Sequence, residues 1–323
     1  MAKNLIFIKS HIMNHNIIEE YQKYLNIDNY DVIFALDNTE QRFSKKTEVI
    51  QELDFYGTKV KCFLFDENVH KLFNLPNYTE DGDESFCKIM WYNADYPFYY
   101  VKHYFPDYDF YWQVEFDVFC NGDSYKFFFD EYSSSEDLIA CYIEKLENND
   151  WYWSKNADWC YKDVPLYKSF YPIVRLSNRA IDFLRKRKIE IGKIYSQSHV
   201  KNKRWLHCEL FTPTELINNN FTWRSIDNQK IYFEETFDIC DDSFAKKDNI
   251  LYHPIKYNYL KRIKKLEEEN NSLVELLKQK ENFQKNRLKT FIKKVFSVQN
   301  SEDKLHKIIT ILGIKISIKI LKK

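Results

Sequence analysis

Two carboxylates that follow an apolar stretch are the residues of this sequence best suited to hold a metal ion. Glu115 and Asp117 come directly after residues 108–114, an aromatic and apolar run typical of a buried strand. Side chains alternate in an extended chain, so the two acids point the same way and repel each other unless a cation lies between them. The pair therefore predicts a divalent metal site, with solvation or pairing to Lys or Arg as the alternative.

A third carboxylate lies in a later apolar stretch. Residues 205–211 read WLHCELF, and we expect a short strand that places His207 and Glu209 on one face. Thr212 and Pro213 then suit the start of a helix. Glu209 is a candidate general base for removing a proton from a hydroxyl, with a structural ion pair or support of the metal site as the alternatives.

The first part of the chain predicts alternating strands and helices. Strands are expected over residues 4–8, 31–36 and 59–65, with a helix over 16–25. This order indicates an α/β fold with a mostly parallel sheet, in which ligands bind beyond the carboxyl ends of strands. The polar residues at those ends are candidate nucleotide contacts, with ordinary loop residues as the alternative: Ser10, His11, Asp37 and Asp66.

Two further helices are expected in the middle of the chain. Residues 91–105 predict a helix for which Asp95 is the N-cap and Pro97 lies in the first turn. Residues 171–176 predict a strand that enters a helix capped by Ser177.

A helix is also predicted over residues 138–146, and the SSSED turn at 133–137 would cap it. Aromatic residues are concentrated after this helix. The aromatic residues are Trp151, Tyr152, Trp153 and Trp159. Aromatic faces stack on the apolar faces of sugar rings, so this segment predicts an acceptor platform, with core packing as the alternative. Asp158, in the same segment, is a candidate catalytic residue that would bind a sugar hydroxyl.

The composition excludes several classes of protein. The chain of 323 residues has only 5 Gly and neither a GxGxxG nor a Walker A pattern, so any phosphate must be held by metal, by Lys or Arg, or by helix N-termini. Its 7 Cys include no CxxC pair, which favours reduced thiols in a cytoplasmic protein. We expect neither a signal peptide nor a membrane-spanning stretch.

The neutral total charge conceals a basic C-terminal segment. Residues 285–323 hold eleven Lys and Arg against two acids, a net charge of +9, so the remaining residues sum to −9. Residues 257–284 predict a helical segment, with coiled-coil spacing from Tyr259 to Leu277 that suits a homo-oligomer, and a packed extension is the alternative. We expect residues 285–323 to be a basic amphipathic tail that binds an anionic membrane surface. The rest of the chain is acidic, and we expect it not to bind nucleic acid.

Several segments together resemble the bacterial GT-A glycosyltransferases of capsule and lipopolysaccharide clusters, including glycosyltransferase-like proteins of unassigned substrate. The segments are WYNADYP at 91–97, PDYDFYWQVEFDV at 106–118, NGD at 121–123, DLIA at 137–140, WYW at 151–153 and HCELFTPT at 207–214. The resemblance covers residues 1–256, and Glu115-Phe116-Asp117 stands where that family has Asp-x-Asp.

The resemblance implies a GT-A-like domain that transfers a sugar from a nucleotide-sugar to a glycan or lipid-linked acceptor, at the cytoplasmic side of the inner membrane. It implies Mn²⁺ or Mg²⁺ held by Glu115 and Asp117, with His253 completing the metal shell and Lys256 holding the diphosphate. A retaining enzyme would need no base, and Glu209 would then position the acceptor. The alternatives are a transferase of a non-sugar group to capsule and a non-catalytic oligomerising scaffold.

Overall fold

The computed structural model divides the chain into two compact units, residues 1–257 and 258–323. The described residues are 2–80, 85–120, 124–147, 151–155, 157–199, 204–233, 250–255, 272, 278, 280, 292, 296–300, 306–311 and 314–319.

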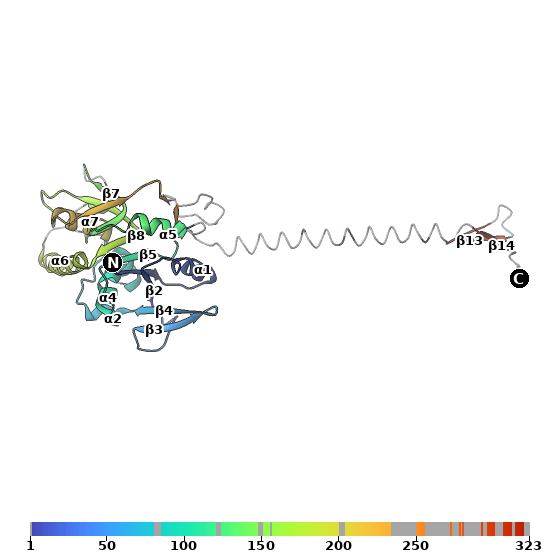
Figure 1. Ribbon diagram of the computed structural model, residues 1–323, viewed down its shortest axis with the longest axis horizontal. Coiled ribbons are helices and arrows are strands. Elements are labelled where there is room, and N and C mark those ends of the chain that lie inside the picture. Colours follow the sequence, from blue (N-terminus) through green and yellow to red (C-terminus); the bar gives the residue numbers. More distant parts are fainter. Residues whose placement is uncertain are drawn as a thin grey trace. The chain divides into compact units, whose positions relative to one another are not determined.

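The first unit is built on an eight-stranded mixed sheet (Figure 1). In chain order its strands are β1 (Asn4–Ser10), β2 (Tyr30–Asp37), β3 (Ile50–Phe55), β4 (Thr58–Phe65), β5 (Phe110–Glu115), β7 (Leu138–Lys145), β8 (Tyr167–Ser177) and β9 (Trp223–Ile226). The spatial order is β3-β4-β2-β1-β5-β8-β7-β9, and four of the seven pairings are parallel. The predicted α/β class is thus confirmed, with β1 and β5 side by side at the centre.

Helices cover both faces of this sheet because its central strands are apolar on both sides. In β1, Leu5 and Phe7 join one core cluster, and Ile6 and Ile8 join the other. The Leu5 side is covered by α2 (Glu67–Leu72), α3 (Phe86–Tyr92), α4 (Tyr96–Tyr104), α6 (Asn178–Gln197), α7 (Cys208–Asn218) and the 3₁₀ turn η1 (Tyr152–Ser154). The Ile6 side is covered by α1 (His15–Tyr24) and α5 (Ser124–Glu131).

A small second sheet connects the end of β5 to a much later segment. It consists of β6 (Phe119–Cys120), β10 (Ile231–Phe233) and β11 (Leu251–His253), in the order β10-β11-β6. Tyr252 pairs with Phe119, and the Ile255 N–H donates to the carbonyl of Asp117 at 2.8 Å. These bonds fix the chain around residue 253 beside the turn that follows β5.

The helix predicted over residues 138–146 is wrong, because this segment forms β7. β7 lies between β8 and β9 and is buried on both faces. It therefore lacks the alternation of apolar and polar residues that marks a half-buried strand, and its apolar residues fit the spacing of a helix. The pairing with β8 also shifts register after Ala140 and again after Cys141, and Tyr142 has a φ of +53°, which disturbs the alternation further. The carboxylate of Asp137 binds Ser177, Arg179 and Thr222.

The strand predicted over residues 205–211 is also wrong, because α7 begins at Cys208. The His207 side chain caps this helix by accepting the N–H of Glu209. Pro213 lies inside α7 and leaves the carbonyl of Glu209 without its helical donor. The Ser169 hydroxyl donates to that carbonyl at 3.4 Å, which offsets the loss. A short apolar run is equally compatible with a strand and a helix, and these contacts decide for the helix.

The region around Asp95 is only partly as predicted. The helix expected over residues 91–105 is two helices, α3 and α4, and Asp95 occupies the N-cap position of α4 with Pro97 in the first turn, without a capping hydrogen bond. Instead, Asp95 accepts from Tyr99 and pairs with Lys188 at 3.1 Å, where both side chains are fully buried. The predicted N-cap Ser177 is confirmed, since its hydroxyl accepts the N–H of Ala180.

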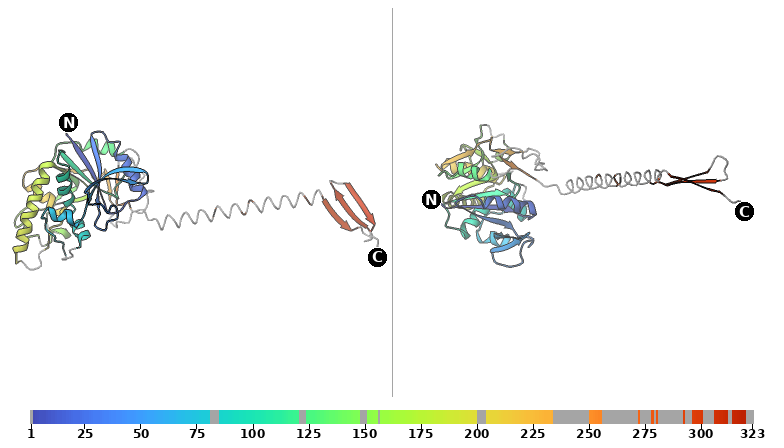
Figure 2. Two further views of the ribbon diagram at one scale, coloured as in Figure 1. Left: turned by 90° about the horizontal axis from the view of Figure 1, so that it is seen from below. Right: turned by 45° about the vertical axis from the view of Figure 1, so that its right-hand side comes forward.

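The last described segments of the second unit form a three-stranded antiparallel sheet (Figure 2). Its strands are β12 (Phe296–Asn300), β13 (His306–Ile311) and β14 (Ile314–Lys319). In β14, Ile alternates with Lys and Ser, which is the period of a strand. The predicted coiled-coil spacing lies almost entirely outside the described residues. No helix in the described ranges has both the length and the apolar character required to cross a membrane.

Candidate functional site

Three potential metal ligands converge at the carboxyl end of β5. Glu115 ends β5, Asp117 follows in the turn, and His253 ends β11, which pairs with β6 just beyond that turn. One ligand atom from each side chain lies within 4.8 Å of the others. Within the described part of the chain, no other group of three His, Cys, Asp or Glu side chains is this compact.

Charge holds the three groups together. His253 Nε2 lies 3.2 Å from Glu115 Oε2 and 3.3 Å from Asp117 Oδ1. Burial alone would lower the pKa of His253, but the two carboxylates outweigh it and raise that pKa. Burial would raise the pKa of Glu115, but Lys9 and His253 outweigh it and lower that pKa. A proton on His253 thus provides positive charge between the acids, and a bound cation would take over this role.

The residues present fit a divalent cation. Asp117 Oδ1 is buried and, among the described residues, has no hydrogen-bond partner apart from the ion-pair contact with His253. His253 is itself one of the three potential ligands, so this buried carboxylate oxygen is open to a metal that takes the place of the imidazole proton. Two carboxylates and an imidazole form a donor set that suits Mn²⁺, with Mg²⁺ as a harder alternative that prefers oxygen.

Lys9 is a member of this cluster that sequence reasoning missed. It is the cross-strand partner of Glu115 in the pairing of β1 with β5, and its Nζ lies 3.2 Å from Glu115 Oε1. The signal was a Lys at the carboxyl end of an otherwise apolar strand, next to the acid strand in a parallel sheet. Pairing of the acids with Lys, the alternative to a metal site, therefore coexists here with the metal-ligand geometry.

Glu209 lies in the first turn of α7 and is electrostatically linked to the three-residue cluster. Burial raises the pKa of Glu209 to about 8, with a further contribution from the like charge of Glu115. His253 and Lys9 act in the opposite direction. His207, at the start of the same helix, stays neutral because burial and the charges of Lys188 and Lys9 lower its pKa to about 3.

The predicted nucleotide contacts lie at the same end of the sheet, but most of them have local structural roles. Ser10 donates to the Ile12 carbonyl and accepts its N–H. Asp37 accepts from the backbone and hydroxyl of Thr39. Asp66 caps α2. His11 lies near the cluster, since its ring is 5.1 Å from that of Phe116, the residue between Glu115 and Asp117 in the sequence.

The two remaining predicted site residues are Asp158 and Lys256. Asp158 is exposed in the loop after η1 and is not part of the Glu115, Asp117 and His253 group. Lys256 lies outside the described residues.

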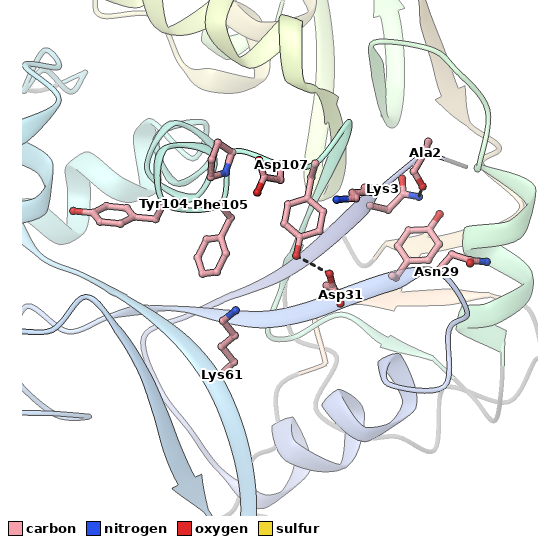
Figure 3. Close-up of a pocket in the computed structure, with 12 residues that line it drawn as sticks. Ala2, Lys3, Asn29, Asp31, Lys61, Tyr104, Phe105 and Asp107 are labelled. Atoms are coloured by element: carbon pink, nitrogen blue, oxygen red, sulfur yellow. Dashed lines mark hydrogen bonds between the residues drawn. The ribbon is translucent and has the colours of Figure 1, made fainter.

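A hollow of about 660 Å³ lies at the opposite end of the strands (Figure 3). Its lining includes Lys3, Asp31 and Tyr108, which lie at or near the amino ends of β1, β2 and β5, and Lys61 on β4. Tyr108 donates to Asp31 at 2.6 Å. Ligands of parallel strands bind at the carboxyl ends, so chemistry rather than hollow size identifies the candidate site.

Comparison with known proteins gives structural neighbours only. No protein-family model and no curated protein matches this sequence. The fold is similar to that of mouse xyloside xylosyltransferase 1, with 11% identity over 78% of this chain and 96% of that one, at a TM-score of 0.43. It is also similar to the galactosyltransferase LgtC, with 11% identity over 77% and 86%, at a TM-score of 0.42. A glycosyltransferase involved in glycosylation of the major capsid of PBCV-1 matches with 10% identity over 82% and 98%, at a TM-score of 0.37. At these scores the likeness adds no argument about function.

Proposed function

We propose that this chain is a metal-dependent glycosyltransferase that moves a sugar from a nucleotide-sugar donor to a glycan or lipid-linked glycan acceptor. The proposal depends on one observation, the convergence of Glu115, Asp117 and His253 at the end of a central strand where sheets of this kind bind ligands. Acids alone would repel a diphosphate, so a cation between them is required. The segments that resemble bacterial GT-A enzymes favour sugar transfer over other phosphate chemistry.

The residues around the acids support this role. Mn²⁺ or Mg²⁺ at Glu115, Asp117 and His253 would supply charge neutralisation for the departing diphosphate. Lys9 holds Glu115 from the neighbouring strand, and such a partner orients a ligating carboxylate. His11, beside Phe116, lies where it can contact the donor.

Glu209 is the proposed acceptor-side residue. When ionised, it can take a proton from an acceptor hydroxyl, as an inverting reaction requires. When protonated, it can donate a hydrogen bond that positions the acceptor, as a retaining reaction allows. A pKa near 8 makes both forms accessible around neutral pH, so the stereochemistry of the product decides between the two roles.

The proposed setting is surface-polysaccharide synthesis at the cytoplasmic side of the inner membrane. Residues 285–323 carry a net charge of +9, and the side chains of Lys315 and Lys319 on β14 are exposed. Basic side chains on such a segment are attracted to anionic lipid. The coiled-coil spacing before it supports self-association.

Calorimetric titration with UDP, GDP and CMP, each with and without Mn²⁺, tests the proposal. We expect one of the three to bind only when Mn²⁺ is present. Binding that does not depend on metal would contradict the role of the acids. If none of the three bound, a transferase of a non-sugar group or a non-catalytic scaffold would be the better account.

A further inference from the structure

Three aromatic side chains form an exposed cluster on α3 and η1, here called the aromatic platform: Trp91, Tyr152 and Trp153. Trp91 is 54% exposed and Tyr152 is 47% exposed, while Trp153 is half-buried between them. The ring of Trp153 lies 5.8 Å from that of Trp91 and 4.6 Å from that of Tyr152, so the three form one continuous patch. Leaving two large rings in water is unfavourable unless a partner covers them.

The inner side of the platform is held rigidly. Trp153 stacks on the imidazole of His207, with ring centroids 4.3 Å apart and an interplanar angle of 9°. The buried ring of Tyr92 contacts both Trp153 and His207 edge-on. The outer rings therefore rest on fixed neighbours, which reduces the entropy that binding would cost.

The platform is continuous with the candidate site. His207 Nδ1 lies 3.7 Å from Glu209 Oε2, and Glu209 is close enough to Glu115 for their charges to interact. Glu209 thus adjoins the inner side of the platform through His207 and interacts electrostatically with Glu115, one of the three potential metal ligands.

The rim of the platform is polar. Arg204 lies over the ring of Tyr152 at 5.2 Å and is 2.7 Å from Glu80 Oε1, and Tyr152 donates its hydroxyl proton to Glu80. A guanidinium and a carboxylate next to flat aromatic faces match a sugar, which has an apolar ring face and hydroxyls around its edge. A protein partner would normally require a larger apolar area than three rings provide.

We propose that the aromatic platform binds a pyranose ring of the acceptor glycan, by stacking on Trp91 and Tyr152 and by hydrogen bonding to Arg204 and Glu80. The identity of this glycan as the acceptor rests on the proposed function, whereas sugar binding on the platform does not. Since packing on His207 and Tyr92 holds the platform, we expect the glycan to bind without donor or metal.

Glycan binding to the full chain tests this inference. A panel of oligosaccharides ending in glucose, galactose or N-acetylhexosamine is screened without nucleotide or metal, and the best binder is titrated into variants. Trp91→Ala should weaken binding about tenfold or more, and Trp91→Phe should restore much of it. Trp223→Ala removes a Trp that is 42% exposed on β9 and should have no effect, which makes it the matched control.

The outcomes separate this inference from the proposed function. No binding by any panel member, or equal affinity in wild type and Trp91→Ala with unchanged melting temperatures, would overturn the platform assignment. Nucleotide titration of the same variants gives the second readout. If Trp91→Ala loses glycan but no nucleotide binds even the wild type, the platform stands as a sugar site and the transferase proposal falls.

Discussion

His253 Nε2 lies 3.2 Å from Glu115 Oε2, although 138 residues separate them in the sequence. The pairing of β11 with β6 produces this contact, because it aligns residues 251–252 with residues 119–120, immediately after the acid turn. The site therefore depends on a two-residue strand, β6, as much as on the central sheet. The predictions below test the site, its supports and the tail.

Glu209→Gln should preserve nucleotide affinity and lower sugar transfer by about 100-fold or more, the usual effect of losing a general base. Steady-state turnover and nucleotide titration on the same preparation measure the two quantities. Unchanged turnover would exclude Glu209 as the base and leave it a positioning or structural role, and lost nucleotide affinity would assign it to the donor site.

Asp137 should make folding stability depend on pH in the acid range. Burial would raise the pKa of Asp137, but hydrogen bonds from Arg179, Ser177 and Thr222 outweigh it and lower that pKa. A lowered pKa means that the stabilisation is present above the unfolded value near 3.9 and is lost as the pH falls below it.

Asp137→Asn should therefore cost about 2 kcal/mol of unfolding free energy at pH 7, since several hydrogen bonds to a charged group weaken. Urea denaturation of wild type and variant at pH 7 and at pH 3 measures the difference. The gap should shrink at the lower pH, because the unfolded wild type then takes up a proton that the folded carboxylate binds less readily. A gap of constant size would show that charge contributes nothing.

Lys188→Met should destabilise the protein by about 3–5 kcal/mol, because Asp95 would be left as a buried charge without its partner. The double variant Lys188→Met with Asp95→Asn should recover much of that loss, since neither charge remains. Urea denaturation of both single variants and the double variant measures the coupling. Additive losses would argue against an energetically coupled pair.

Deleting residues 285–323 should release the protein from anionic vesicles while nucleotide binding stays the same. The deleted segment carries +9, and each basic side chain near anionic lipid contributes about 1 kcal/mol. Flotation at low and high salt measures binding, which salt should weaken for the intact chain. If the intact chain stays off vesicles at low salt and the deletion lowers the melting temperature, the tail binds the acidic body instead.

Local patterns in the sequence were sufficient to predict the α/β class, the strands β1, β2 and β4, and the acid pair, whereas β3 was not predicted. Glu115 and Asp117 could be found because the strand and its acids are adjacent in the sequence. Lys9 could not be placed, because its role depends on which strands are neighbours in the sheet. The segment around Glu209 was assigned as a strand because seven apolar-rich residues fit either structure, and the cap by His207 and the Ser169 contact are tertiary information.

The aromatic platform, too, could be predicted only in part from the sequence. Tyr152 and Trp153 stood out as a sugar-stacking segment, but Trp91 belongs to a helix about sixty residues earlier and joins them only through packing. Burial, which distinguishes a core Trp from a binding Trp, is likewise a property of the folded chain. Trp159, in contrast, donates its indole N–H to the Arg204 carbonyl and packs against the core.

The most direct test of the central claim is Mn²⁺ binding followed by electron paramagnetic resonance, with and without UDP. The wild type should bind one Mn²⁺ per chain, and Asp117→Asn should weaken this binding by about 100-fold, because a charged ligand is lost at the centre of the site. Glu19→Gln, which neutralises a surface carboxylate that is 58% exposed, should bind like the wild type. Equal Mn²⁺ affinity in Asp117→Asn and the wild type, or no Mn²⁺ bound by the wild type, would contradict the claim that Glu115, Asp117 and His253 form a metal site.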